Sequence, residues 1–254
     1  MDITIANISG MDGPTLQAAV AAIGRQVTEH FQPEWGLGGT LTVTAVVLGQ
    51  QQAPIPAIQD AVIYIGNSSQ DPTSGVDGTL GYHFQNFAHV PYGFVYLDVC
   101  AKANEPWTVS LSHEVLELLG DPEVTQTVTG PAPGGAAGLA AYDLEVADPT
   151  QGDSYLIDGV SVSNFVGRAY FGQSGGSGRT NYLDLPLAAF GVRPKGYFQW
   201  EDGNGGANTV KGFLVTDEQF AAKTLLKSGR RNERRRQRLA GATAAKKGKQ
   251  ARRG

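Results

Sequence analysis

SLSHEVLELLGDP, residues 110–122, carries the pattern that decides the fold of this chain. His113 and Glu117 are four residues apart, so on a helix their side chains lie on the same face, one turn from each other. Glu114 follows His113 directly and lies about 100° further round the helix axis. The stretch therefore predicts a helix that presents one imidazole and two carboxylates close together.

Two functional interpretations of this helix are open. A hydrolytic zinc site takes three protein ligands and a water molecule, whose proton passes to a nearby carboxylate. His113 and Glu117 would supply two ligands and Glu114 the general base, with Glu117 at the position where an H-E-x-x-H motif has its second histidine. Alternatively, the apolar residues around the motif make this a buried helix that contains one histidine bonded to a carboxylate.

A second acidic segment, YDLEVADP (142–149), offers candidates for the third ligand. Glu145 and Asp148 are three residues apart, so they point the same way if the segment is helical. One could then bind the metal ion and the other could accept the free ring N–H of His113. If the segment is extended, the two face opposite sides and one alone can serve. A solvent-facing acidic turn before Pro149 is the plain alternative.

Composition limits the class of protein. The chain has 254 residues, of which 41% are hydrophobic, so it can form a sizeable core, and its 34 glycines and 13 prolines predict many loops. The single Cys100 excludes an internal disulfide framework and a cysteine-rich zinc module. No apolar run of about 18 residues indicates a membrane span, and the first residues show no signal peptide. We therefore expect a cytoplasmic or virion-associated protein without a membrane partner.

The net charge of −4 hides two regions of opposite sign. Residues 1–222 carry seven Lys/Arg and 23 Asp/Glu, whereas residues 223–254 carry 13 Lys/Arg and a single acidic residue, Glu233. We predict one acidic domain over 1–222 and a basic tail over 223–254 that is disordered or partly helical. The tail could bind nucleic acid through phosphates or pair with an acidic partner, or it could be a solvated end.

The remaining pattern predicts an α+β fold. Alternating or β-branched stretches indicate strands at 2–9, 40–48, 60–66 and 93–100, and helical spacing indicates a helix over 14–31 that Pro33 stops. Asn104 or Glu105 would cap the motif helix, and Gly120 followed by Pro122 would end it. Residues 154–166 suggest a hairpin with a turn at Asp158-Gly159. Loops are expected at 129–141, 172–178 and 202–208.

Several segments in order resemble a zincin-like family of bacterial and phage proteins. The HEVLELLGDP helix is followed by YDLEVADP and then by GVSVSNFVGRAYF, and further similar stretches lie at 26–36, 80–84, 90–98 and 195–200. The resemblance covers about residues 15–200 and implies a zincin-like α+β fold, with a mixed or antiparallel sheet packed on a central active-site helix. No Met-turn is present, since the methionines are Met1 and Met11, which disfavours the metzincin branch.

The resemblance also implies a site. It gives His113 and Glu117 as metal ligands, Glu114 as catalytic acid/base, Glu145 as the third ligand and Asp148 as its outer partner. The implied ion is zinc, with manganese or iron not excluded by the oxygen-rich ligands. Two carboxylates and one imidazole would cancel the charge of a divalent ion, so the bound water should be less acidic than at a strong zinc hydrolase site.

Other polar residues are weaker candidates. His83, in GYHF, could stabilise an oxyanion across the cleft, although an ordinary hydrogen-bonded histidine is the plainer interpretation. Tyr142, Tyr155 and Tyr170 could play the same part, and core packing is the plainer interpretation of each. We expect a metal-dependent hydrolase, most simply a zinc metallopeptidase that holds an extended peptide beside the strand at 93–100. The alternative is a weak or inactive zincin-like scaffold of phage or virion origin, used for assembly or binding.

Overall fold

The computed structural model describes residues 1–45, 60–71, 78–86, 88–202 and 206–212. Its larger sheet has five strands in the order β2-β1-β3-β5-β4. β1, β2, β3 and β5 are mutually parallel, and β4 runs antiparallel to β5 at the edge. The strands are β1 (Asp2–Asn7), β2 (Thr40–Ala45), β3 (Ala61–Gly66), β4 (Gly81–Gln85) and β5 (Pro91–Tyr96).

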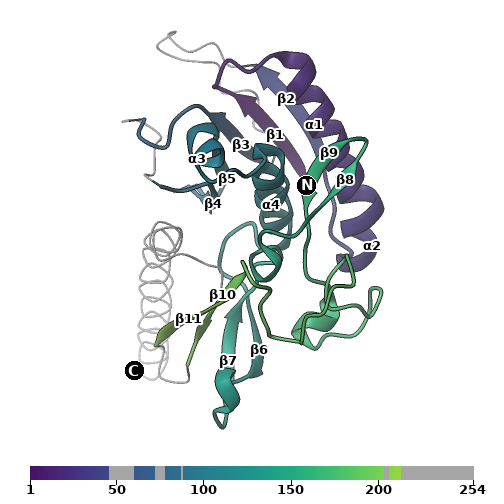
Figure 1. Cartoon of the computed structure of the whole chain (residues 1–254), viewed down its shortest axis with the longest axis vertical. Helices are drawn as coiled ribbons and strands as arrows, with labels where there is room; N and C mark the ends of the chain where they lie inside the picture. Colours follow the sequence, from purple (N-terminus) through teal and green to yellow (C-terminus); the bar gives the residue numbers. More distant parts are fainter. Residues whose placement is uncertain (46–59, 72–77, 87, 203–205, 213–254) are drawn as a thin grey trace, which may run out of the picture.

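Two long helical segments cover one face of this sheet. α1 (Gly13–Arg25) begins at Asp12, whose carboxylate accepts the N–H of Thr15, and α4 (Trp107–Gly120) runs through the middle of the molecule (Figure 1). Their apolar side chains meet Ile3, Ile5 and Ile63 in one hydrophobic cluster. α4 is therefore buried on nearly all sides, as its residues from Val109 to Gly120 are all buried.

Smaller elements complete the fold around α4, and the second sheet lies below this helix in Figure 1. A four-stranded sheet has the order β11-β10-β7-β6, and β8 pairs with β9 as a separate hairpin. The structure is thus mixed, with sheets and a few helices, which is compatible with the expected α+β class. These elements are β6 (Thr127–Pro131), β7 (Leu139–Asp143), β8 (Ser154–Ile157), β9 (Val160–Ser163), β10 (Tyr197–Glu201), β11 (Ala207–Lys211), α3 (Leu97–Lys102) and the 3-10 turns η2 (Pro133–Gly135), η3 (Asp148–Thr150) and η4 (Arg168–Phe171).

The first predicted helix does not stop at Pro33. After α1 the chain widens into a π-helical turn, η1 (Gln26–Phe31), and continues as α2 (Gln32–Trp35) up to Gly36, whose φ of 70° ends it. Pro33 lies in the first turn of α2, where its missing N–H costs nothing. The predicted helix end was wrong because a proline, which disrupts the interior of a helix, fits the first turn of the next helical segment.

Two further predicted segments need correction. The strand expected at 93–100 ends at Tyr96, and Leu97–Lys102 forms α3, in which the Asp98 carboxylate accepts the N–H groups of Ser69 and Val99. β5 also lies between β3 and β4, so it is not available to an added strand, and among the described strands β2 and β4 are the edges. The loop expected at 129–141 is mostly the β6–β7 hairpin, whose tip is η2.

Other expectations are confirmed. The strand at the N-terminus, the motif helix and its end at Gly120 occur as predicted, although Pro106 takes the N-cap position without a side-chain cap. The turn at Asp158 and Gly159 has φ values of 51° and 80°, as a two-residue hairpin requires. Residues 46–48, 203–205 and the basic tail at 223–254 lie outside the described residues.

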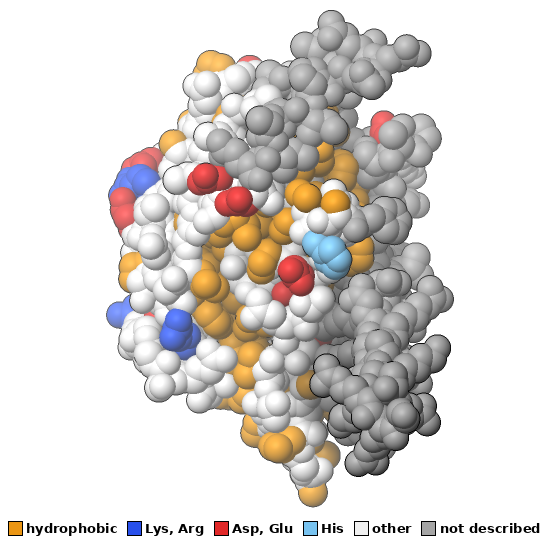
Figure 2. All heavy atoms as spheres, turned by 180° about the vertical axis from the view of Figure 1, so that it is seen from behind, with side chains coloured by type: hydrophobic (Ala, Val, Ile, Leu, Met, Phe, Trp, Pro, Cys, Tyr) orange, Lys and Arg blue, Asp and Glu red, His pale blue; other side chains and the backbone are white. Residues whose placement is uncertain are grey.

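The second face of the larger sheet is rich in aromatic side chains. Tyr64, Tyr82, Tyr92 and Phe94 are half-buried there, and the rings of Tyr64 and Phe94 stack with centroids 4.9 Å apart. Figure 2 views the molecule from behind and shows hydrophobic side chains gathered in a band with few charged side chains among them. Within the described residues, no helix is both long and apolar enough to cross a membrane.

Candidate metal centre

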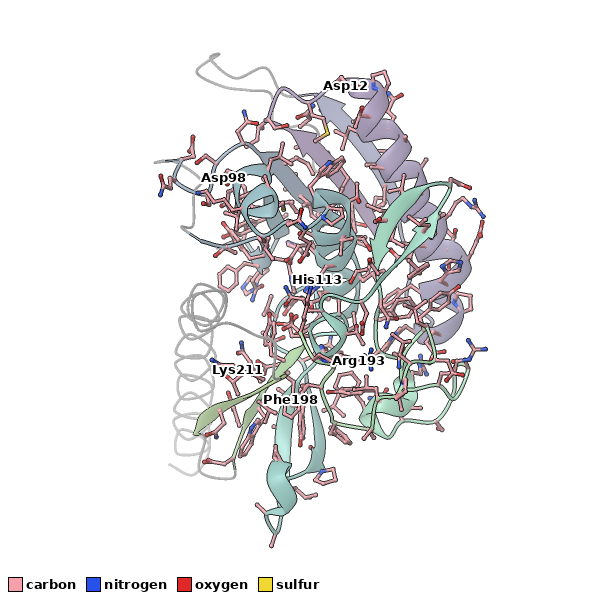
Figure 3. The ribbon with its side chains drawn as sticks, in the orientation of Figure 1. Asp12, Asp98, His113, Arg193, Phe198 and Lys211 are labelled. Carbon is pink, nitrogen blue, oxygen red and sulfur yellow. The ribbon has the colours of Figure 1, made fainter. Side chains whose placement is uncertain are left out.

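α4 places three of the predicted site residues under the larger sheet. His113 Nε2 lies 3.2 Å from Glu117 Oε1, as the four-residue spacing on a helix predicts. Figure 3 shows His113 near the middle of the molecule, between the sheet and the β6–β11 region. His113, Glu114 and Glu117 are exposed by 6%, 4% and 1%, so the helix carries its polar motif into the interior.

The first cluster joins His113 and Glu117 to Asp148. Asp148 Oδ1 lies 3.2 Å from His113 Nε2, on the side of the imidazole that also faces Glu117. The two segments are tied together because the backbone N–H groups of Ala147 and Asp148 donate to Glu117 Oε1 over 3.3 and 3.1 Å. These three side chains could hold a metal ion, since each offers a ligand atom within 4.8 Å of the others.

The second cluster is centred on His83, which the edge strand β4 points towards α4. His83 Nδ1 lies 3.4 Å from Glu114 Oε2 and 3.8 Å from Glu117 Oε2. Its other ring nitrogen, Nε2, lies 3.9 Å from Glu145 Oε2. His83, Glu114 and Glu117 form a second group that could hold a metal ion.

Small residues on the neighbouring strands make room for this cluster. A Cβ at Gly81 would lie 2.9 Å from both Glu114 Oε1 and the backbone oxygen of Phe94, so a larger residue would displace the carboxylate or the strand. Sequence reasoning did not single out Gly81 as part of the site. Its position two residues before His83, on the same face of a strand, is the signal that could have found it.

The charges around the clusters are unbalanced. Seven carboxylates are buried in the described part of the chain, and no lysine or arginine there is buried with them. An isolated carboxylate is costly to bury, so such groups are paired, protonated or bound to a cation. The buried carboxylates are Glu34, Glu114, Glu117, Asp121, Asp143, Glu145 and Asp148.

Asp121, at the end of α4, has a structural explanation. Its two carboxylate oxygens accept the backbone N–H groups of Thr125 and Gln126 over 3.0 and 2.8 Å, which fixes the turn after the helix. Burial, with the charge of Glu145, raises the pKa of Asp121 to about 6 against the lowering effect of those donors. This role agrees with the position of Asp121 directly after Gly120, the last residue of α4, where the chain turns.

The structure thus brings all the predicted site residues together, but it places Glu145 and Asp148 beside different histidines. The sequence favoured Glu145 as the third ligand with Asp148 outside it, whereas Asp148 is the carboxylate beside His113 and Glu145 faces His83. The reason lies in the irregular backbone between β7 and η3, which is neither the helix nor the strand considered for 142–149. The two carboxylates therefore reach two different histidines.

The remaining candidates lie elsewhere. Nδ1 of His30 lies 2.9 Å from the hydroxyl of Tyr155, and burial lowers the pKa of this histidine. His89 Nδ1 lies 2.8 Å from Gln85 Oε1. The hydroxyl groups of Tyr142 and Tyr170 donate to backbone oxygens, as expected of tyrosines in a core.

A chain of polar contacts fixes α4 behind the site. The Ser112 hydroxyl, directly before His113, donates to Gln26 Oε1 over 2.6 Å and accepts the backbone N–H of Ser163. The Gln26 amide donates in turn to the Ser163 carbonyl over 2.7 Å. These buried contacts lock α4 to η1 and β9 at the residue directly before His113.

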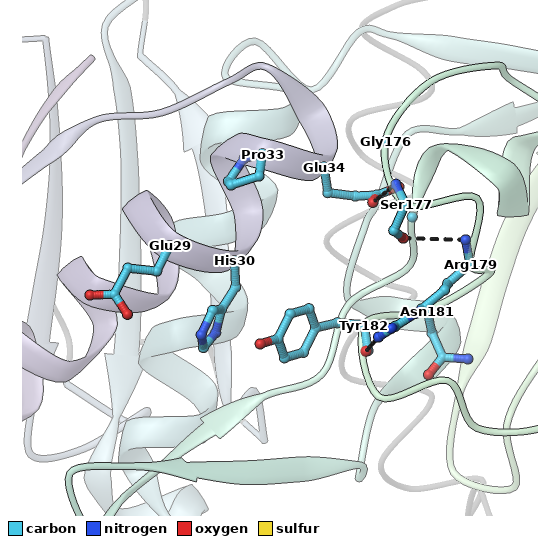
Figure 4. A pocket seen from close by; sticks show the side chains of 10 residues that line it. Glu29, His30, Pro33, Glu34, Gly176, Ser177, Arg179, Asn181 and Tyr182 are labelled. Carbon is cyan, nitrogen blue, oxygen red and sulfur yellow. Dashed lines mark hydrogen bonds between the residues drawn. The ribbon is translucent and has the colours of Figure 1, made fainter.

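A pocket of about 380 Å³ opens on another side of the molecule, between η1, α2 and the loop that follows β9 (Figure 4). Its lining includes His30, Glu34, Arg179 and Tyr182 but no residue of the two clusters. Glu34 accepts the backbone N–H groups of Arg168 and Ser177 over 3.0 and 2.6 Å. This buried carboxylate therefore anchors the 167–178 loop.

Glu34→Ala should lower the free energy of unfolding by about 3 kcal/mol, because two backbone N–H donors lose a charged, buried acceptor. Urea denaturation followed by circular dichroism measures this. Glu29→Ala, which removes an exposed carboxylate from the same helical segment, is the matched control and should change stability little. Equal effects of both substitutions would contradict the anchoring role of Glu34.

No protein-family model, curated protein or solved structure matches this chain. The class of site is accordingly defined by its residues alone. It is a buried centre of histidines and carboxylates, of the kind that could ligate a divalent cation.

Proposed function

We propose that the protein is a metal-dependent hydrolase, most simply a zinc metallopeptidase with a zincin-like arrangement of helix and sheet. The observation that carries this proposal is the convergence of His113, Glu117 and Asp148 on one point, with Glu114 next to His113 on the same helix. Three protein ligands from one histidine and two carboxylates leave a fourth position of a tetrahedral ion open to water, as a catalytic site needs.

The residues have separate tasks in this proposal. His113, Glu117 and Asp148 hold the ion, which supplies a Lewis acid that makes a water molecule more acidic and polarises a carbonyl group. Glu114 accepts the proton of the attacking water and passes it to the leaving amine. His83 lies within 3.4 Å of the Glu114 carboxylate and orients it, in addition to the oxyanion role expected from the sequence.

The ligand set limits the chemistry. One neutral imidazole and two carboxylates cancel the charge of a divalent ion, so the ion acidifies water less than it would with two imidazoles and one carboxylate. Oxygen ligands also bind manganese or iron well, so zinc is the simplest choice and not a unique one. We therefore propose slow hydrolysis that depends on pH and on the metal supplied.

The substrate site of this proposal is the edge of β4. An extended peptide could pair with this strand, which carries His83 into the centre. The proposed peptide thus pairs with β4 and not with β5, the strand expected from the sequence, because β5 is paired on both sides.

Metal content tests the proposal directly. Protein purified without chelator should contain at least one equivalent of zinc, manganese or iron, and His113→Ala should lose at least one equivalent because it removes a ligand of the hydrolytic ion. Elemental analysis by mass spectrometry measures both. Negligible metal in the wild type, after reconstitution with each ion, would end the metal-dependent interpretation.

A second function is favoured by burial. The side chains of both clusters belong to residues no more than 6% exposed, which suits an ion that stabilises the fold of a non-catalytic scaffold, such as a phage or virion assembly protein. The intact Glu114 favours the enzyme, because an ion-binding scaffold needs no general base. Peptide cleavage by metal-loaded protein separates the two functions.

For the basic tail, 223–254, we propose binding to nucleic acid or to an acidic partner. Its 13 Lys/Arg predict DNA affinity that falls steeply with salt concentration, since each phosphate contact releases counterions. Fluorescence anisotropy should show binding by the full chain and its loss in residues 1–222. Equal binding by the two chains, or none by either at low salt, would remove DNA as the partner and leave the acidic protein.

A further inference from the structure

The two clusters share one residue, Glu117, through different oxygen atoms. Oε1 lies 3.2 Å from His113 Nε2, and Oε2 lies 3.8 Å from His83 Nδ1. A carboxylate that offers one oxygen to each of two separate ligand groups has the geometry of a bridge between two metal ions. The proposed hydrolytic site accounts for the first group and leaves the second unexplained.

One ion does not account for both groups. Ligand atoms around a tetrahedral zinc ion are roughly 3.4 Å apart, because each lies about 2.1 Å from the metal. Within each group the ligand atoms lie within 4.8 Å of one another, but neither group contains both histidines. An ion placed among His113, Glu117 and Asp148 therefore leaves His83 and Glu114 as a separate pair of ligands.

Charge balance points in the same direction. Four carboxylates, Glu114, Glu117, Glu145 and Asp148, lie within 4 Å of the two imidazoles, and together they carry a formal charge of −4 when ionised. One divalent cation leaves half of this charge uncompensated in the interior, where no lysine or arginine of the described chain is buried. Two divalent cations with two neutral imidazoles make the centre neutral.

His83 is also placed as a metal ligand would be. Its Nδ1 faces Glu114 and Glu117, while Nε2 faces Glu145 at 3.9 Å. Histidines that bind metal through one nitrogen commonly direct the other N–H to a carboxylate, which fixes the ring and its tautomer. Glu145 is therefore the outer partner of His83.

We propose that the centre binds two divalent cations, bridged by Glu117, with His83 and Glu114 as the further ligands of the second ion. The inference rests on the proposed function for the first ion and replaces the orienting and oxyanion roles of His83 with ligation of the second ion through Nδ1. It assigns Glu114 one oxygen, Oε2, on the second ion and leaves Oε1, which faces Gly81, for proton transfer. The second site takes hard or borderline ions such as zinc or manganese.

The experiment is a metal titration of the full chain, with Mn²⁺ followed by electron paramagnetic resonance and Zn²⁺ counted by elemental analysis. The wild type should bind two ions, and two Mn²⁺ sharing a carboxylate should give a spin-coupled spectrum. His83→Gln and His113→Gln should each bind one ion and show the uncoupled spectrum of single Mn²⁺. Glu117→Gln should weaken both sites, and His89→Gln, a histidine outside the clusters, should bind two ions as the wild type does.

The outcomes separate this inference from the proposed function. One ion in the wild type, lost in His113→Gln and kept in His83→Gln, would overturn the second site and leave the first intact. No ion in the wild type would overturn both. Two ions that survive His83→Gln would place the second ion elsewhere and overturn its assigned ligands. Because a variant can misfold, Glu114→Gln provides a second test of the ligands assigned to the second ion. Near-UV circular dichroism checks that each variant is folded.

Discussion

Glu114→Gln should reduce metal-dependent peptide hydrolysis by about 10²–10⁴, because it replaces the proposed proton acceptor with a group that cannot accept a proton. The substitution keeps the size of the side chain and leaves the ligands His113, Glu117 and Asp148 in place. Cleavage of a peptide library by zinc-loaded or manganese-loaded protein, read by mass spectrometry, identifies a substrate. The kcat/KM for that substrate then gives the size of the loss.

The control for this experiment is the metal content of the variant. Glu114→Gln should retain the ion at His113, and a loss of activity larger than that of His83→Gln, which removes the other ligand of the proposed second ion, assigns the excess to proton transfer. A variant as active as the wild type would exclude Glu114 as the base. A metal-loaded wild type that cleaves no peptide would favour the scaffold function.

Removal of metal should lower the melting temperature by about 8–16 °C relative to protein in an ion concentration 1,000 times the dissociation constant. Binding to the folded state alone contributes about 4 kcal/mol at that concentration, and each kcal/mol corresponds to roughly 2–4 °C in a domain of this size. The structural cause is the set of four carboxylates within 4 Å of His83 and His113, which repel one another when no cation lies among them. Differential scanning calorimetry with and without chelator measures the shift.

Glu117→Gln tests the origin of this shift, because Glu117 belongs to both ligand groups. The variant should show little change in melting temperature on chelation, whereas His89→Gln should keep the full shift. If chelation leaves the wild type unchanged, the buried carboxylates are neutralised by protons and no cation stabilises the fold.

Local sequence signals predicted the local structure well. Helix α4 follows from the spacing of its motif and from Gly120, and the β8–β9 turn follows from Asp158-Gly159, since both depend on residues close in sequence. The same holds for His113 and Glu117, whose contact is set by helix geometry.

Features that depend on distant residues were not predictable in this way. The contact between His83 and Glu114 joins residues 31 positions apart, and it requires the edge position of β4, which follows from the order of the whole sheet. The choice between Glu145 and Asp148 depended on an irregular backbone that the Glu117 carboxylate stabilises through two N–H groups. The chain after the early strand end at Tyr96 likewise contacts a distant segment, since Asp98 accepts the backbone N–H of Ser69.

The edge position of β4 has a consequence for selectivity. A peptide added to this strand would run about 4.8 Å from it and would turn successive side chains to opposite faces of the sheet. His83 points to the face covered by α4, whereas Tyr82 and Phe84 belong to the aromatic face. Substrate positions would then alternate between a polar, metal-lined side and an apolar side, so a recognised peptide would follow a pattern that repeats every two residues.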